Sequence, residues 1–358
     1  MNTPAFLPGL ELARRFYREA VRPLLEEAVP ETPHSAALLG PGSEVLGFDT
    51  PRSRDHDWGP RLQLFLTHRD ARRHGPRLHR HLAEHLPADF LGHPTRFALT
   101  GEDTATDARH HVEVTDPAAW FTAHLGFDPT ADVTPADWLA TPTQLLAQAT
   151  AGAVFHDGLH RLAPARYRLR WYPRDLWLHV LACQWRRLAQ EEAFVGRCGE
   201  VGDDLGSAVV TARLVRDLMR LHLLMNRRYP PYSKWLGSAF ARTPGAAELT
   251  PHLIAALTAA DWRTREHHLC RAYEHAARAH NRLGLTDPVD PTTRPFHDRP
   301  FRVLGADRLA TALRSRIADP ALRALPASGA VDQYVDNTDV LTRPPLARAT
   351  ALTPPPHP

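Results

Sequence analysis

Apolar residues recur at helical spacing over the first part of the chain. Between residues 8 and 29 they repeat every three or four positions, which predicts an amphipathic helix. Pro23 lies inside this pattern, so we expect a kink or a restart there. Two short apolar runs, 35–39 and 62–66, are typical of strands. Trp58-Gly59-Pro60 precedes the second run and indicates a bulge or an edge position.

A further strand is expected within residues 97–116, and from about residue 135 the pattern becomes helical. Four stretches show this helical pattern: 138–154, 172–188, 207–227 and 250–284. A turn is expected at His156-Asp157-Gly158. Pro230-Pro231 should end the preceding helix, because neither proline can donate an amide hydrogen bond. Asp203 and Asp204 precede the 207–227 helix and most simply cap it, with a catalytic base as the alternative.

The order of these elements predicts an α+β fold in two domains. We expect a small mixed-sheet domain over residues 1–134 and a mainly α-helical domain over 135–325. Residues 326–358 are rich in proline and small side chains and are expected to form an extension. Its last segment, 352–358, should be mobile. The length of 358 residues supports two domains, because single cores stop growing near roughly 250–300 residues.

Composition favours a cytoplasmic protein. No run of about 18 apolar residues predicts a membrane span, and the N-terminus does not resemble a signal peptide. Cys183, Cys198 and Cys270 are widely separated, which favours reduced thiols over disulfides or a zinc site. The net charge of +3 is too small to indicate nucleic-acid binding by itself.

The stretch 69–86 is rich in Arg and His, and two interpretations of it remain open. A solvated basic helix is favoured, and a metal site formed by His79, His81 and His85 is the alternative. The glutamate of His81-Leu82-Ala83-Glu84-His85 is not at the position of HExxH zinc chemistry. No aromatic residues are interleaved there for stacking on bases.

Lys234 is the only lysine among the 43 Lys and Arg residues. An Arg-rich sequence that retains one lysine indicates a position where a compact ammonium is needed, with chance survival as the alternative. Lys234 follows the Pro230-Pro231 break, together with Tyr232 and Trp235. Either aromatic residue could stack on a ligand ring or pack in the core.

The main chemical motif lies in the first quarter of the chain. The apolar run 35–39 leads into Gly42-Ser43, and Asp55 and Asp57 follow eleven residues later. In an extended segment residues i and i+2 share a side, so the two carboxylates would project together and His56 would point away. Two neighbouring carboxylates repel unless a cation lies between them, and Mg²⁺ is held by such groups together with phosphates. Glycine lets a phosphate approach the backbone.

This spacing resembles the signature of the DNA polymerase β-like nucleotidyltransferase superfamily. That resemblance implies a third acidic residue on a later strand between apolar residues, and Glu113 in His111-Val112-Glu113-Val114 fits it. An ordinary exposed strand residue is the alternative for Glu113. Glu44 and Asp49, near the Gly-Ser turn, are expected to form turns or caps instead.

The chain also resembles a bacterial family known only as a domain of unknown function, over about residues 5–340. Its members join a nucleotidyltransferase-like half to a helical half. The likeness lies in Gly42–Asp49, Asp55–Arg61 and Tyr229–Trp235. It suggests no substrate.

The resemblance to nucleotidyltransferases implies transfer of a nucleoside monophosphate from a triphosphate, with ATP expected, to a hydroxyl acceptor, with a small molecule as the leading expectation. Asp55, Asp57 and Glu113 would bind two Mg²⁺ ions, and Gly42, Ser43, Lys234 and Tyr232 would bind the nucleotide. No membrane partner is expected, and the base preference and oligomeric state are left open.

Three other functions remain as alternatives. The acceptor could be a protein or an RNA end. The fold could be a non-catalytic nucleotide-binding or toxin–antitoxin module. Finally, the segment Arg216–His222 resembles the Arg-x4–6-His motif of helical prokaryotic ribonucleases, although Arg and His are frequent in this chain.

Overall fold

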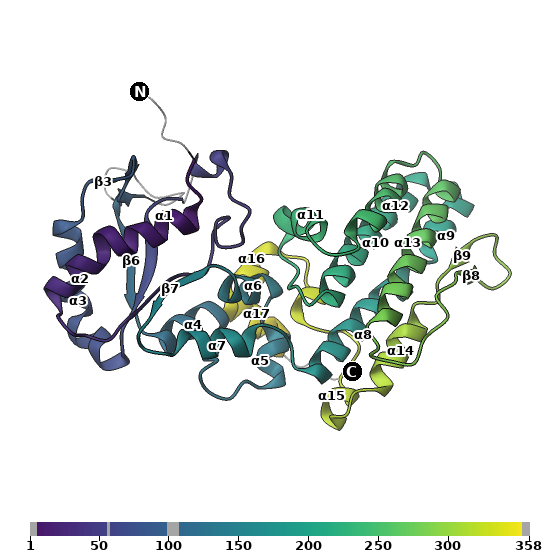
Figure 1. Ribbon diagram of the computed structural model, residues 1–358. Helices are drawn as coiled ribbons and strands as arrows, with labels where there is room; N and C mark the ends of the chain where they lie inside the picture. Colours follow the sequence, from purple (N-terminus) through teal and green to yellow (C-terminus); the bar gives the residue numbers. More distant parts are fainter. Residues whose placement is uncertain (1–5, 56–57, 99–106, 353–358) are drawn as a thin grey trace. The chain divides into compact units, whose positions relative to one another are not determined.

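The computed structural model describes residues 6–55, 58–98 and 107–352, which form two compact units (Figure 1). Unit 1 contains residues 1–134 and 145–170, and unit 2 contains residues 135–144 and 171–358. The expected boundary after residue 134 coincides with the first passage of the chain between units. Residues 145–170, expected in the helical domain, belong to unit 1.

Unit 1 is built on a five-stranded mixed sheet. Its strands are β1 Ser35–Leu38, β2 Arg61–Phe65, β5 Arg96–Phe97, β6 Arg109–Thr115 and β7 Ala153–Asp157. They lie in the order β5-β6-β2-β1-β7, with β2 and β6 parallel and the other neighbours antiparallel. The expected mixed sheet and its three early strands are present. β2 lies in the middle of the sheet, so the expectation of an edge at Trp58-Gly59-Pro60 was wrong: these residues precede the strand.

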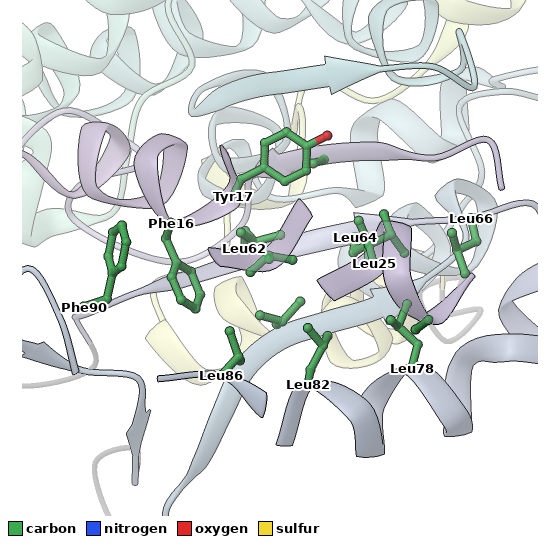
Figure 2. Close-up of a cluster of buried hydrophobic side chains, with 14 of the residues drawn as sticks. Phe16, Tyr17, Leu25, Leu62, Leu64, Leu66, Leu78, Leu82, Leu86 and Phe90 are labelled. Carbon is green, nitrogen blue, oxygen red and sulfur yellow. The ribbon is translucent and has the colours of Figure 1, made fainter. Parts of the chain in front are cut away.

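One face of the sheet packs against three helices, α1 Gly9–Phe16, α2 Arg22–Ala28 and α3 His68–His85. Leu62 and Leu64 of β2 meet Leu78 and Leu82 of α3 and Phe16 of α1 in one buried cluster (Figure 2). Each such leucine contributes roughly 1.5–3 kcal/mol by leaving water. Because successive side chains of a strand point to opposite faces, the residues of β2 next to these leucines point to the other face of the sheet.

The helix predicted over residues 8–29 is confirmed, with an irregularity at the expected place. A π-helical turn, Tyr17–Val21, joins α1 to α2 directly before Pro23. Proline cannot donate the amide hydrogen bond that a regular helix requires at this position, so the widened turn accommodates it.

The other face of the sheet meets α4 Pro117–Leu125 and α6 Thr143–Thr150. Phe65 contacts Trp120 of α4 edge to face, with ring centroids 6.1 Å apart. The amide of Gly40 donates to the carbonyl of Gln148 on α6. Gln63 of β2 and Glu113 of β6 point to this side, where Gln63 is buried and Glu113 is exposed.

The strand β7 corrects the helical pattern expected for residues 138–154. This region forms α5 Pro135–Ala140, then α6, then β7. Ser35 of β1 donates a hydrogen bond to Asp157 of β7, 122 residues away. Val154 therefore pairs with a distant strand, which local periodicity cannot reveal.

Unit 2 is mainly helical, as expected. Its long helices are α8 Arg174–Glu191, α10 Asp204–Met225 and α13 Trp262–Arg282. The shorter helices include α9 Phe194–Glu200, α11 Ser233–Ala241, α12 Ala246–Thr258, α14 Asp307–Ser315 and α15 Pro320–Ala324. The stretch expected as one helix over 250–284 forms α12 and α13, because Asp261 caps α13 by accepting from the amide of Thr264. Within the described ranges, we find no helix that combines the length and the apolar character needed to cross a bilayer.

The C-terminal extension packs into unit 2. It forms a 3₁₀ turn Val331–Gln333 and two short helices, α16 Thr338–Thr342 and α17 Pro344–Leu352. Val331 and Ala347 are fully buried. The Gln333 amide donates to Val180 and Gln184 of α8. The segment 352–358, expected to be mobile, lies outside the described residues except for Leu352.

Candidate functional site

The Gly-Ser turn lies in the loop that follows β1, which ends at Leu38. Gly42 has φ +137°, in the region that favours glycine. A Cβ at this position would lie 2.3 Å from Nη2 of Arg61 and 2.6 Å from Oε2 of Glu44. Glycine is therefore required here for two reasons, its backbone conformation and the close approach of these side chains. The Ser43 hydroxyl has no hydrogen-bond partner among the described residues.

Arg61, at the start of β2, braces this turn. Its Nε and Nη2 donate to Oε1 of Glu44 at 2.9 and 2.5 Å, and Nη2 also donates to the carbonyl of Pro41. Glu44 is 2% exposed, so this is a nearly buried ion pair. Sequence reasoning assigned Glu44 to the turn but did not identify Arg61, although Arg61 ends the stretch that carries the family likeness. Asp49 has the expected capping role, accepting from the Gly9 amide at 2.7 Å.

Glu113 lies on β6 directly beside Gln63 of β2. Both point away from the leucine cluster, because Leu62 and Val112, their neighbours, belong to it. The side chains of Gln63 and Trp120 hydrogen-bond to the Glu113 carboxylate. Although Glu113 retains exposed surface, desolvation by the surrounding protein raises its pKa, and these two hydrogen bonds partly offset the rise.

Gln63 connects Glu113 to the beginning of the Gly-Ser loop. Its Oε1 accepts from the amide of Leu39 at 2.9 Å, and its Nε2 donates to the carbonyl of Leu39 at 3.3 Å. Gln63 is itself 7% exposed. The only sequence signal for this residue is a polar side chain within the apolar run 62–66.

The two aspartates of the motif are described only in part. Asp55 is the last residue of a 3₁₀ turn, Pro51–Asp55, so the extended conformation assumed for it was wrong. Its side chain and the whole of Asp57 lie outside the described residues. Among the described residues, no three His, Cys, Asp or Glu side chains converge on a metal position.

Tyr232 and Lys234 lie at the beginning of α11 in unit 2. The amide of Tyr232 donates to the side chain of Gln144 at 3.0 Å, and Tyr232 hydrogen-bonds to Trp235. Burial raises the pKa of the Tyr232 hydroxyl. Lys234 is exposed, and its ammonium lies 5.0 Å from the centre of the Trp235 ring. No carboxylate of the described residues pairs with it.

The polar side chains of the Arg216–His222 segment are committed to other parts of unit 2. Arg216 pairs with Asp336, Asp217 pairs with Arg187 at 3.2 Å, and the ring of His222 bonds to Pro244. Burial lowers the pKa of His222. The arrangement does not support the ribonuclease alternative. Of the two acids at the start of this helix, Asp203 caps it as expected, accepting from the Gly206 amide at 2.7 Å, whereas Asp204 is its first residue and pairs with Arg265.

The histidines of α3 are held by local contacts. The rings of His81 and His85 stack 4.2 Å apart, and Nδ1 of His85 bonds to the carbonyl of His81. The rings of His79 and His110 of β6 lie 4.3 Å apart with their planes tilted by 49°. The solvated basic helix is therefore the better description of this segment.

One hollow of unit 1 lies at the opposite end of β2 from the Gly-Ser turn. Its volume is about 350 Å³, and Thr67, His68 and Asp116 are among its lining residues. Thr67 and Asp116 cap α3 and α4 with their own side chains. These side chains already accept hydrogen bonds from amides at the starts of the two helices, so the hollow adds no free group to the candidate site.

The comparisons with known proteins bear on the middle of the chain. No curated protein and no solved structure matches it. Gly42, Asp55 and Glu113 lie outside the one matched region, and Tyr232 and Lys234 lie inside it. The match is to a family model described as "Domain of unknown function (DUF4037)", over residues 138–236, from α5 into α11.

Proposed function

We propose that this protein is a Mg²⁺-dependent nucleotidyltransferase. It would move a nucleoside monophosphate from a triphosphate, with ATP expected, to a hydroxyl group of a small molecule. The observation that supports this most is the contact of Gln63 with both Leu39 and Glu113. It links Leu39, the first residue after β1 on the way to Gly42-Ser43, with the strand that carries Glu113.

The Glu113 carboxylate suits a cation ligand. It lies on the face of the sheet away from the helix-packed core, and its hydrogen-bond partners, an amide and an indole, carry no charge. Its raised pKa means that its surroundings do not fully stabilise the negative charge of the ionised carboxylate, and a bound divalent ion would stabilise that charge. Asp55, Asp57 and Glu113 would hold Mg²⁺. The bound metal would lower the pKa of the acceptor hydroxyl and neutralise phosphate charge.

The register of the sheet sets a condition for this ligand set. Asp57 precedes Gln63 by six residues, and a straight strand of that length would separate them by roughly 20 Å. The chain bends at Gly59 and Pro60. This bend must direct Asp57 back toward β6 if Asp57 and Glu113 are to share an ion.

In the proposed transfer, the acceptor oxygen attacks the α-phosphorus and the bond from that phosphorus to the bridging oxygen breaks. The hydroxyl proton passes to solvent, and pyrophosphate leaves. Ser43 and the Gly42 backbone would hold phosphate oxygens. Lys234 would neutralise the departing pyrophosphate, and its place in the first turn of α11 supports an anion partner, since a cation alone is disfavoured there.

The test uses the full chain with Mg²⁺ and each α-labelled nucleoside triphosphate, together with a panel of hydroxyl acceptors, including the protein itself and RNA. Pyrophosphate release and labelled acceptor are measured. Asp55→Ala and Asp57→Ala should each abolish turnover while the melting temperature is unchanged. Asp132→Ala, an exposed aspartate of unit 1, is the matched control and should retain turnover. Wild-type turnover in both motif variants would disprove the proposal.

A further inference from the structure

The helix α3 carries the whole net charge of the chain. It contains five arginines against two acids, Asp70 and Glu84, which gives it a charge of +3 with histidine neutral. The full chain of 358 residues also has a net charge of +3. Positive and negative residues therefore balance over the rest of the chain, and the excess lies in 18 residues. A modest total charge conceals a strongly basic element.

The five arginines share one side of the helix. At 3.6 residues per turn they fall within an arc of about 140°, along about 17 Å of the helix axis. The opposite side holds Leu78 and Leu82, which point into the core of unit 1 (Figure 2). All five arginines are exposed: Arg69, Arg72, Arg73, Arg77 and Arg80. We call this surface the α3 arginine face.

None of these five arginines pairs with a carboxylate of the described residues. The arginines of α1 and α2 differ in this respect. Arg14 pairs with Glu11, and Arg22 pairs with Glu26. Arg15 pairs with Glu19 across the π-helical turn. Asp70, the acid nearest the α3 arginine face, is engaged by Thr67 at the N-cap. The face therefore presents cationic groups that no described carboxylate neutralises.

The side chains of this face favour a nucleic-acid duplex over other polyanions. A helix that binds membrane surfaces inserts large apolar side chains, but the leucines of α3 are buried in unit 1. Single strands are held by stacking on aromatic residues, and α3 contains no Phe, Tyr or Trp. Guanidinium groups bind phosphate oxygens bidentately. Duplex RNA is recognised largely through its phosphates and its shape rather than its base edges, which such a surface suits.

We propose that the α3 arginine face binds the phosphate backbone of an RNA duplex without sequence specificity. This binding does not depend on the proposed nucleotidyl transfer.

The experiment measures fluorescence anisotropy of a labelled 20-base-pair RNA duplex against the full chain at several salt concentrations. The variant carries Arg69→Gln, Arg73→Gln and Arg80→Gln, at the centre of the arc; glutamine preserves helix propensity. The control variant carries Arg14→Gln, Arg15→Gln and Arg22→Gln, which removes the same charge from the same unit. Circular dichroism establishes that both are folded.

We expect the α3 variant to bind roughly a hundredfold or more weakly at 0.1 M salt. The slope of log affinity against log salt concentration should be smaller by about two to three, because fewer counterions are released. The control should bind like wild type. An equal loss of RNA affinity in both variants would mean that binding depends on the net charge of the protein and not on the α3 arginine face, which would overturn the proposal. Wild-type binding by the α3 variant would overturn it as well. A DNA duplex or vesicles of anionic lipid that bind as tightly as the RNA would overturn the choice of RNA.

Discussion

Individual residues connect the expected site to the sheet. Arg61 fixes the Gly-Ser turn through Glu44, and Gln63 joins that region to Glu113. Both lie on β2, two positions apart, so they point to the same face. Removing either partner of the nearly buried Arg61–Glu44 pair would leave an uncompensated charge, which typically costs about 3–5 kcal/mol.

The replacement Glu113→Gln should separate function from stability. If Glu113 is a metal ligand, turnover should fall by about 10²–10³-fold, as for the loss of one preorganised electrostatic contact. Stability in metal-free buffer at pH 7 should be unchanged or higher, because a carboxyl group with a raised pKa destabilises the fold once it ionises. Urea unfolding and pyrophosphate release measure the two effects. Unchanged turnover would leave Glu113 as an ordinary strand residue.

Lys234→Arg tests why one lysine remains in an arginine-rich chain. The side chain is exposed and contacts Trp235, so the melting temperature should not change. We expect a higher KM for the triphosphate or a lower kcat, because a planar guanidinium does not replace a compact ammonium at a phosphate. Steady-state kinetics give the answer, with Arg228→Gln, on a nearby exposed loop, as the control. Kinetics equal to wild type would favour chance survival of the lysine.

At the scale of elements, capping and long-range polar contacts determine where helices begin and how they are held. Glu192, just beyond α8, accepts from three successive amides, Leu304, Gly305 and Ala306, at 2.6–3.1 Å. This carboxylate anchors the beginning of α14 to the end of α8. Asp203 and Asp261 cap α10 and α13 in the same local way.

The helix α13 should make the stability of unit 2 depend on pH. Burial raises the pKa of Glu266 to about 7. The folded state then keeps a proton that the unfolded chain releases, so stability falls as the pH rises from about 4.5 to 7. Glu266→Gln should therefore be more stable than wild type at pH 8 but not at pH 4.5.

Urea unfolding at these two pH values, with Glu84→Gln on the surface of α3 as the control, measures the effect. The stabilisation at pH 8 should be absent from the control, because Glu84 is exposed. An equal response of the two variants to pH would exclude Glu266 as the source.

At the scale of the whole chain, the C-terminal extension is part of unit 2. Asp332 accepts from the amide and the hydroxyl of Thr143, both at 2.9 Å. Arg220 of α10 donates to the carbonyl of Asp332 at 2.8 Å. A segment expected only as an extension therefore joins residues 189 positions apart in the sequence.

Truncation after residue 325 should destabilise unit 2. It would expose the core around Val331 and leave the partners of Gln333 unsatisfied, at roughly 1–3 kcal/mol for each buried polar group. We expect a lower melting temperature and faster proteolysis within α8 and α10. Truncation after residue 352 is the control and should melt like the full chain. Equal melting of both truncated chains would show that residues 326–352 contribute no stability.

Much of the element pattern was predictable because it depends on neighbours in sequence. The helix over 8–29 with its irregularity at Pro23, the three early strands and the Asp203 cap all follow from local spacing. The strand β7 did not, because Val154 continues the helical pattern of the preceding residues. The acidic and glycine residues of the candidate site could be proposed from the sequence motif. Arg61 and Gln63 were missed because their partners lie 17 to 50 positions away along the chain.

The sequence by itself determined the α+β class, the beginnings and ends of most helices, and the acidic and glycine residues worth testing. Those features depend on hydrogen bonds and side-chain periodicity within a few residues. Only the tertiary structure decided which face Glu113 occupies, what holds the Gly-Ser turn, and that the arginines of α3 remain unpaired. Each of these depends on contacts between distant segments, or on the lack of them in the described residues. Local patterns of residue types, such as hydrophobic periodicity, carry no information about such contacts.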